Sequence, residues 1–176
     1  HGLLPHLDRV NPDVVKNALD KLKSSKSDAL FDFNSDCLIN ASAELIEKIT
    51  MLFKWFLRTG VIPNFLLICT LVPIVKDNLA DITSSENYRA IAIGSLILKW
   101  FDWLILILES DKLTTDELQF GFQAKASTSM CSWAVSAVVD HYNRSGRIVY
   151  SCAMDLSKAF DLVSWNKLFP GLIERG

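Results

Sequence analysis

The sequence lacks the excess of basic residues that proteins usually need to bind nucleic acid on their own. It has 18 Lys and Arg against 20 Asp and Glu, a formal net charge of −2 and an isoelectric point near 5.9. Nucleic acid presents a negative charge at every phosphate, so a binder normally carries a basic face. The composition therefore argues against autonomous nucleic-acid binding, although a few local basic residues can still line a groove.

Metal-binding patterns of cysteine and histidine are also missing. The four cysteines occur singly, no Cys-x-x-Cys pair is present, and none of the three histidines stands at ligand spacing. This spacing argues against a zinc site. We expect each cysteine to be a small core hydrophobe of a protein in a reducing intracellular compartment, the cytoplasm or the nucleus. The cysteines are Cys37, Cys69, Cys131 and Cys152.

The sequence has no uninterrupted membrane-spanning run, and we do not expect its opening residues to be a signal peptide. The longest apolar stretch, 91–108, is interrupted by Lys99 and Asp102. A charge in the middle of a span costs about 2.5–3.5 kcal/mol on insertion scales. The stretch therefore predicts a buried helix, and we expect no membrane partner. The opening residues have neither a basic start nor a cleavage pattern, and we interpret the chain as an internal fragment.

Helical and strand-like segments alternate along the chain. Apolar residues recur at helical spacing in some segments and form continuous β-branched runs in others. The expected helices cover about 12–23, 42–58, 96–109, 127–142 and the residues from 165, and the expected strands cover 65–75, 88–93 and 147–154. A chain of 176 residues suits one domain or one lobe of a larger one. The alternation predicts an α/β or α+β fold.

Cap and turn residues support these boundaries. Asn11 before Pro12 is typical of a helix start. Gly60 suits a helix C-terminus, and Pro63 prevents the helix from restarting. The run that follows, 65–75, is apolar throughout, which predicts a strand buried on both faces.

The most informative segment is 147–161, RIVYSCAMDLSKAFD, in which an apolar, β-rich stretch leads directly into Asp155. A carboxylate at the end of a buried strand is held rigidly at a solvent-facing edge, where α/β proteins place their chemistry. The plainer interpretation of Asp155 is a cap of a short helix that follows the strand.

Three further patterns precede this segment. A Gly-x-x-Pro turn at 60–63 joins a helix to a strand, and we assign it no function. LVPIVK at 71–76, a polar loop and NYRAIAI at 87–93 predict a hairpin. QFGFQAKAST at 119–128 is a loop that leads into a helix. The order of these patterns along the chain is more specific than any one of them.

Across about 24–169, the four patterns in this order resemble reverse transcriptases of non-LTR retrotransposons, which are RNA-directed DNA polymerases. The D-x-x-K-A-F-D of 155–161 resembles the first catalytic motif of that family. The resemblance implies the fingers of a right-hand polymerase with the first palm strand, truncated. Residues of about 1–145 would form the fingers and connecting helices, and about 146–176 the start of the palm.

The resemblance also implies roles for single residues of the last segment. Asp155 would be the catalytic carboxylate and would hold two Mg²⁺ ions together with the backbone carbonyl of Leu156. Lys158 and Phe160 would belong to the nucleotide site. The Phe160 ring would pack under the sugar and leave no room for a 2′-hydroxyl.

Basic and helix-capping residues elsewhere would bind phosphate. Lys76 and Arg89 on the hairpin would reach the triphosphate of the incoming nucleotide. Lys125, Ser127 and Thr128 would contact template or primer backbone, because a helix N-terminus is a natural phosphate site. From the residues alone, the plainer interpretation of Lys76 and Arg89 is that they lie at a solvated hairpin tip. The plainer interpretation of the other three residues is a capped surface helix.

The sequence departs from the family pattern in three places. Ala90 replaces the Pro of the usual Asn-Tyr-Arg-Pro, which makes the hairpin less rigid, and Gln123 stands for an Arg, which weakens phosphate contact. The second catalytic carboxylate pair is missing, since no Asp-Asp dipeptide occurs. Metal pairs need several oxygen ligands to neutralise their charge. We therefore expect the fragment to be inactive by itself.

In the complete protein the resemblance implies an RNA template, a DNA primer and deoxynucleoside triphosphates as partners. Two other classes of function stay open. One is a different Mg²⁺ enzyme, such as a phosphotransferase with an Asp nucleophile at a strand end. Such a site needs a second acidic residue two positions after the Asp, and this sequence has Ser157 there. The other is a non-enzymatic retroelement remnant that acts as an interaction or structural module. We also expect the fragment to self-associate, because a lone palm strand leaves unpaired edges.

Overall fold

The computed structural model describes residues 7–113, 115–123, 125–156, 159–160 and 162–174. The chain divides into two compact units, His1–Ser110 and Asp111–Gly176. Helices predominate, and the only sheet of the described residues is a two-stranded antiparallel hairpin. This arrangement is of the mixed α+β kind. No helix within the described ranges is both long and apolar enough to cross a membrane.

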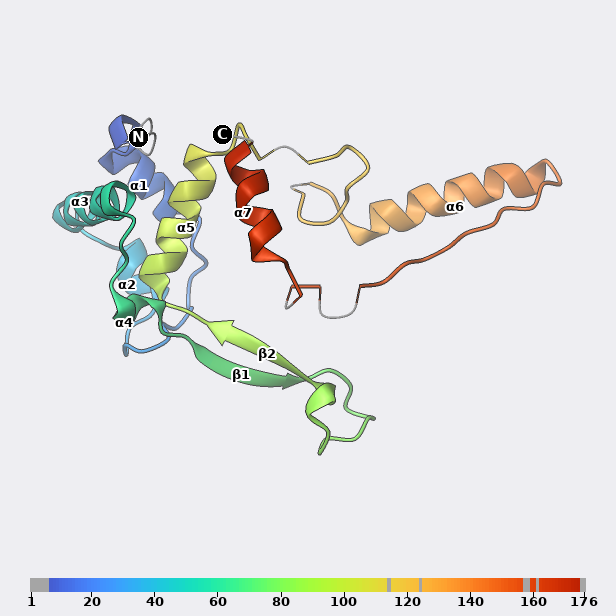
Figure 1. Cartoon of the computed structure of the whole chain (residues 1–176), viewed down its shortest axis with the longest axis horizontal. Helices are drawn as coiled ribbons and strands as arrows, with labels where there is room; N and C mark the ends of the chain where they lie inside the picture. The colour runs from blue at the N-terminus through green and yellow to red at the C-terminus, as the bar shows by residue number, and fades with distance from the viewer. Residues whose placement is uncertain (1–6, 114, 124, 157–158, 161, 175–176) are drawn as a thin grey trace. The chain divides into compact units, whose positions relative to one another are not determined.

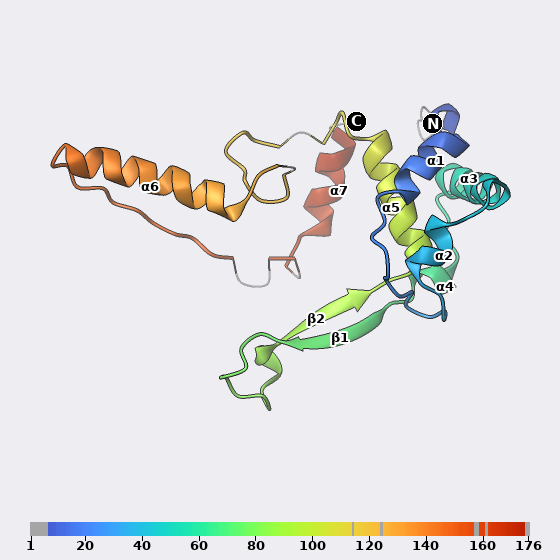
Figure 2. The same cartoon turned by 180° about the vertical axis from the view of Figure 1, so that it is seen from behind.

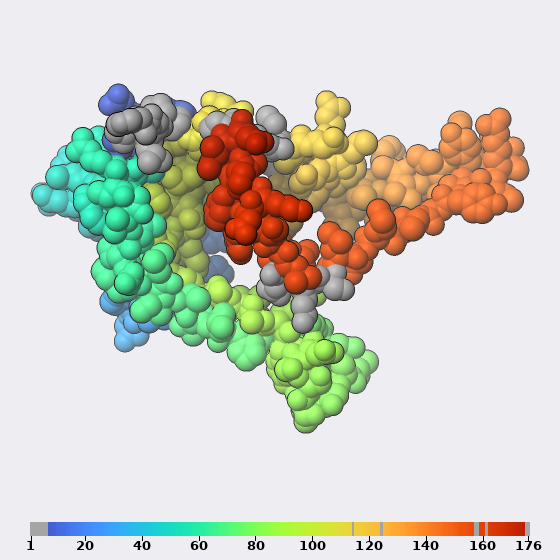
Figure 3. Space-filling view, viewed as in Figure 1, coloured from blue at the N-terminus to red at the C-terminus, as the bar shows by residue number. Residues whose placement is uncertain are grey.

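The first unit is a small helical body with one hairpin (Figures 1 and 2). Its helices are α1 (Pro12–Leu19), α2 (Ser35–Ile39), α3 (Ala43–Thr59), α4 (Asn64–Leu67) and α5 (Leu96–Leu108). The hairpin consists of β1 (Thr70–Val75) and β2 (Tyr88–Ile93), with single 3-10 turns at Leu7–Arg9 and Ser85–Asn87. Figure 3 shows the hairpin extending from the helices as a narrow arm.

The helix ends are where the cap residues predict them. The Asn11 side chain accepts a hydrogen bond from the Val14 N–H at 3.0 Å, and the Ser42 side chain caps α3 in the same way. Gly60 ends α3 with φ of 67°, in the left-handed region that favours glycine. Helix α1 ends at Leu19, earlier than expected. The short α2 was not expected, although Asn34 caps it.

The core of the first unit forms around α5, as the apolar sequence of that helix predicts. Trp100 is fully buried, and its indole N–H donates a 2.8 Å hydrogen bond to the carbonyl of Val15 on α1. Its ring meets Phe53 of α3 edge to face, with centroids 5.6 Å apart. Phe101 also packs on Phe53, at 5.1 Å. The core residues are Val10, Val15, Ala18, Leu19, Leu38, Ile46, Ile49, Phe53, Phe56, Leu66, Leu96, Trp100, Phe101, Leu104 and Leu108.

A buried carboxylate connects the loop after α1 to the start of α5. One oxygen of Asp28 accepts the backbone N–H of Leu96 at 2.7 Å, and the other accepts those of Leu30 and Phe31. Burial by itself raises the pKa of Asp28, but these hydrogen bonds and one from the Ser95 side chain hold it below its ordinary value. The N-terminus of α5 also favours a negative charge there.

The apolar run at 65–75 corrects the sequence prediction. Part of it is the helix α4, and the strand begins only at Thr70. The strand is exposed rather than buried, with Leu71 at 63% and Ile74 at 50% exposure. A continuous apolar run does not by itself separate helix from strand. A two-stranded hairpin has no third strand or covering layer for either face, and Pro73 is tolerated because both strands are edges.

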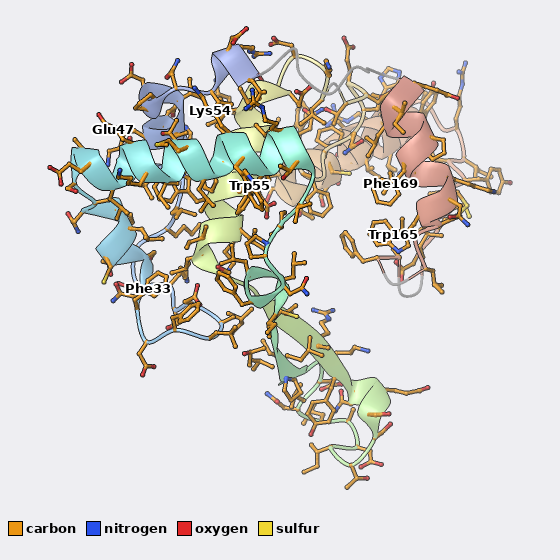
Figure 4. The ribbon with its side chains drawn as sticks, turned by 60° about the vertical axis from the view of Figure 1, so that its left-hand side comes forward. Phe33, Glu47, Lys54, Trp55, Trp165 and Phe169 are labelled. Atoms are coloured by element: carbon orange, nitrogen blue, oxygen red, sulfur yellow. The ribbon has the colours of Figure 1, made fainter. Side chains whose placement is uncertain are left out.

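The second unit contains α6 (Thr128–Arg144) and α7 (Trp165–Glu174). Both helices were expected, and the Ser127 side chain caps α6 by accepting from the Met130 N–H. Neither helix contains a buried residue. On α7 the rings of Trp165 and Phe169 stack with centroids 5.7 Å apart, and Figure 4 shows both on the same helix.

The expected strand at 147–154 is wrong. These residues form no strand and are almost all exposed, Tyr150 at 90% and Met154 at 93%. A strand exists only when a second strand accepts its hydrogen bonds, and no described segment pairs with this one. The expectation of buried cysteines is also wrong, since three cysteines are exposed and Cys131 is half-buried. Apolar neighbours in sequence do not bury a side chain outside a core.

Replacing Phe53 with Ala is expected to lower the free energy of unfolding by about 3–5 kcal/mol, because it removes a fully buried ring that touches three aromatic neighbours. Trp55→Ala on the same helix is the matched control, since Trp55 is 43% exposed (Figure 4). Urea unfolding followed by circular dichroism measures both. An equal loss in the two variants would contradict the assignment of the core.

Replacing Asp28 with Asn is expected to lower the free energy of unfolding at pH 7 by about 1–3 kcal/mol, because an amide nitrogen cannot accept a backbone N–H. Because the pKa of Asp28 is lowered in the folded chain, the stability that its carboxylate contributes should decrease at acidic pH. The wild-type advantage is complete above the ordinary aspartate value of about 3.9 and is lost as the pH falls through the lower folded value.

Asp32→Asn in the same exposed loop is the control and should leave stability unchanged. Urea titrations at several pH values between neutral and strongly acidic measure the difference. A stability gap between wild type and Asp28→Asn that widened on acidification would contradict the proposed role of the carboxylate.

Candidate functional site

The hairpin is the best-defined candidate site, because its register is fixed along the full length of both strands. Ile74 lies opposite Arg89, and Val75 lies opposite Tyr88. Side chains of directly opposite residues project to the same face. Arg89 therefore shares one face with Val72, Ile74 and Ile91. The polar loop at 76–87 connects the strands, as the sequence predicts.

Asn87 organises this loop. It is only 8% exposed, and its side-chain amide donates to the carbonyls of Asp77 at 2.8 Å and Asp81 at 3.4 Å. Its side-chain oxygen accepts the Asp77 N–H at 3.1 Å. The Tyr88 hydroxyl adds a bond to the carbonyl of Ile82 at 2.8 Å. The first two residues of the Asn-Tyr-Arg pattern thus hold the loop, a structural role that the sequence analysis missed.

The two basic residues of the hairpin are both exposed. Lys76 directly follows β1, and its ammonium group donates to the carbonyl of Glu86 at 2.6 Å. Lys76 lies at a bend directly after the last paired residues, Val75 and Tyr88, and so stands at the same end of the hairpin as Arg89. Within the described residues no ion pair engages either side chain. This end of the hairpin therefore offers two positive groups to an anion.

The acidic segment belongs to the second unit and is open to solvent. Asp155 is exposed, and Leu156 is 79% exposed. Asp155 and the Leu156 carbonyl supply two oxygen donors, whereas a pair of Mg²⁺ ions needs several carboxylates. Among the described residues no group of three or more His, Cys, Asp or Glu side chains could hold a metal ion. The residues described do not fit a complete two-metal site.

Phe160 lies outside the core, so its ring is not a buried packing residue. It is 77% exposed and touches Phe122 edge to face, with centroids 6.2 Å apart. Phe122 comes from the Gln-Phe-Gly-Phe loop, so two of the sequence patterns meet here within one unit. The predicted site residue Lys158 lies outside the described residues, as does Asp161.

The loop before α6 is held by its own hydrogen bonds. The side-chain amide of Gln123 donates to the carbonyl of Asp116 at 3.2 Å and to the Thr115 hydroxyl. The residue that replaces the family's Arg is thus turned inward to the loop. Lys125, Ser127 and Thr128 are exposed at the helix start. Lys125 has φ of 66°, in the left-handed region that favours glycine.

The predicted site residues fall in both units. Lys76 and Arg89 belong to the first, and the structure brings them to one end of the hairpin. The remaining described site residues belong to the second unit: Lys125, Ser127, Thr128, Asp155, Leu156 and Phe160. The chain matches no protein-family model and no curated protein.

Replacing Asn87 with Ala is expected to free the loop at 77–86, because it removes three hydrogen bonds from a buried amide. The amide of Asp77 should exchange with solvent about ten times faster or more, since each bond stabilises by about 1 kcal/mol. Hydrogen exchange read by mass spectrometry measures this. Asn78→Ala, an exposed Asn in the same loop, is the control. Unchanged exchange in Asn87→Ala would show that the loop is held by other groups.

Proposed function

We propose that this chain is part of an RNA-directed DNA polymerase of the non-LTR reverse transcriptase type. The observation that carries the proposal is the hairpin, in which Lys76 and Arg89 stand at one end of a loop held by Asn87 and Tyr88. The same Lys-loop-Asn-Tyr-Arg order motivates the resemblance in the sequence. In this role the two basic residues bind the triphosphate of an incoming deoxynucleotide.

The chemistry of the two side chains suits a triphosphate. Arg89 offers a planar fork that matches two phosphate oxygens, and Lys76 offers a compact charge on a long stem. The Lys76 ammonium already donates to a neutral carbonyl, that of Glu86. Exchange of this acceptor for an anionic oxygen gives a stronger, charge-assisted hydrogen bond. Exposure of both residues leaves the approach open.

The residues of the second unit take their proposed roles from the same resemblance. Asp155 and the Leu156 carbonyl would be part of a Mg²⁺ site, whose other carboxylates are not among the described residues. Lys158 and Phe160 would line the nucleotide site, and the exposure of the Phe160 ring supports its availability to a sugar. An RNA template and a DNA primer would be the partners.

The experiment is a titration of the full 176-residue chain with a fluorescent deoxynucleoside triphosphate. The double variant Lys76→Gln/Arg89→Gln should bind at least about tenfold more weakly, because it loses two charge-assisted contacts. The control is Lys48→Gln/Arg58→Gln, which removes the same charge from exposed positions of α3. Equal affinity in both double variants would refute a nucleotide role for the hairpin.

Primer extension on an RNA template tests the catalytic part separately. The chain alone should show no synthesis with Mg²⁺ or Mn²⁺, because one carboxylate cannot supply the electrostatic stabilisation of a metal pair. Templated synthesis that disappears in Asp155→Asn would contradict this expectation.

A non-enzymatic interaction or structural module is the second candidate function. The observation in its favour is that the first unit has a continuous core of its own, whereas the segment before Asp155 forms no strand. A folded chain whose nucleotide affinity does not respond to Lys76 and Arg89 would favour this alternative.

A further inference from the structure

A pocket in the first unit concentrates four lysines around an apolar floor. It lies between the segment that follows α1 and one side of α5, and these two elements lie side by side in both views (Figures 1 and 2). Its volume is about 330 Å³, within the range of small-molecule sites. Its lining, which we name the lysine pocket, consists of Lys21, Leu22, Lys23, Lys26, Leu96, Lys99, Asp102, Trp103 and Leu106. None of these residues belongs to the hairpin.

The backbone that carries three of the lysines is held in place. Ser35 is fully buried, and its hydroxyl donates to the carbonyl of Lys23 at 2.7 Å and accepts the N–H of Lys26 at 3.0 Å. The N–H of Lys21 donates to the carbonyl of Ala18 at the end of α1. A single buried hydroxyl therefore fixes both ends of the segment at 23–26. The positions of these charges follow from the fold.

Helix α5 supplies the opposite wall through a second stripe of side chains. Lys99, Trp103 and Leu106 recur at helical spacing beside the stripe that faces the core. Trp103 is 39% exposed and Leu106 is 46% exposed, so apolar and aromatic surface is open to a ligand. Leu22 and Leu96 complete the floor. Burial of such surface by a ligand is favourable.

The charges of the pocket are unbalanced. Four of its lining residues are lysines and Asp102 is its one acid, in a chain with a formal net charge of −2. Within the described ranges none of the four amines forms an ion pair. Clustered like charges raise the local concentration of counter-ions. The pocket therefore favours a ligand that brings negative charge.

We propose that the lysine pocket binds a small organic anion with a flat apolar body, such as an aromatic carboxylate or sulfonate. The apolar floor and Trp103 would cover the rings, and the amines would hold the acidic group. A nucleic-acid strand fits less well, because it needs a track of charges along its backbone, whereas these four lysines gather at one pocket.

The experiment titrates the full chain with the aromatic sulfonate 8-anilino-1-naphthalenesulfonate and follows its fluorescence. Lys23→Gln/Lys99→Gln removes one amine from each wall and should weaken the saturable binding about tenfold. The control is Lys48→Gln/Lys54→Gln on α3, where neither residue lines the pocket. It changes the net charge equally and should bind as wild type does, and Figure 4 shows Lys54 on that helix. Equal weakening in both double variants, or none in either, would refute the site.

Two further measurements separate the proposed anion from other ligands. Asp102→Asn should tighten binding about two- to threefold, because it removes the only negative group of the pocket. The uncharged analogue N-phenyl-1-naphthylamine should bind at least about tenfold more weakly than the sulfonate. Equal affinities for the neutral analogue and the sulfonate would refute the role of the lysines and show that the pocket binds only apolar rings. Displacement of the sulfonate by a single-stranded oligonucleotide, at lower concentration than by 2-naphthoate, would assign the pocket to nucleic acid instead.

These outcomes are independent of the nucleotide titration, because the variants of the lysine pocket leave the hairpin unchanged. Each double variant is checked by circular dichroism, and the helical signal should be preserved, because Lys23, Lys48 and Lys54 are exposed and Lys99 is only half-buried.

Discussion

The carboxylate of Asp28 is the interaction on which the first unit depends. It connects the loop after α1 to the first turn of α5, two segments 68 residues apart in sequence. A buried charge is tolerated only when hydrogen bonds satisfy it. Asp28 meets this requirement with three backbone N–H donors, one of them at the positive end of α5. The orientation of the central helix is fixed there, and the core packs on that helix.

The second fixed point is the indole of Trp100, which bonds to the carbonyl of Val15. The segment with Lys21, Lys23 and Lys26 runs between these two points, from α1 to Asp28. Its path over the side of α5 therefore follows from these two points and from the buried hydroxyl of Ser35, which holds its backbone at Lys23 and Lys26. The buried groups that stabilise the unit thus also hold three lysines of the pocket next to α5. The candidate binding site therefore depends on the same interactions as the core.

In the second unit, local sequence determines where helices form even though no core covers them. Ser127 caps α6, and both α6 and α7 form where their sequences predict them. Neither helix buries a residue, and Trp133 remains 74% exposed. Most helical stability in proteins comes from packing of an apolar face. Large exposed apolar surfaces mark sites of association. Self-association of the chain stays a prediction, and its ground is now this exposed apolar surface, because the strand at 147–154 with its unpaired edges is not formed. Asp155 and Phe160 lie in the same unit.

Most helix ends, the loop at 76–87 and the hairpin could be predicted from the sequence, because caps, turn residues and the pairing of adjacent strands act over short distances. The exposure of β1 and the missing strand at 147–154 could not, since both depend on which other segments supply a partner or a cover. The sequence did not indicate that Asp28 is structurally important, because it stands in a loop of mixed polarity. The sequence did not group the four lysines either, since Lys21 and Lys23 fell in one expected helix and Lys99 in another. Only tertiary structure could give these residues their roles, because it alone decides which distant backbone groups and helix faces they meet.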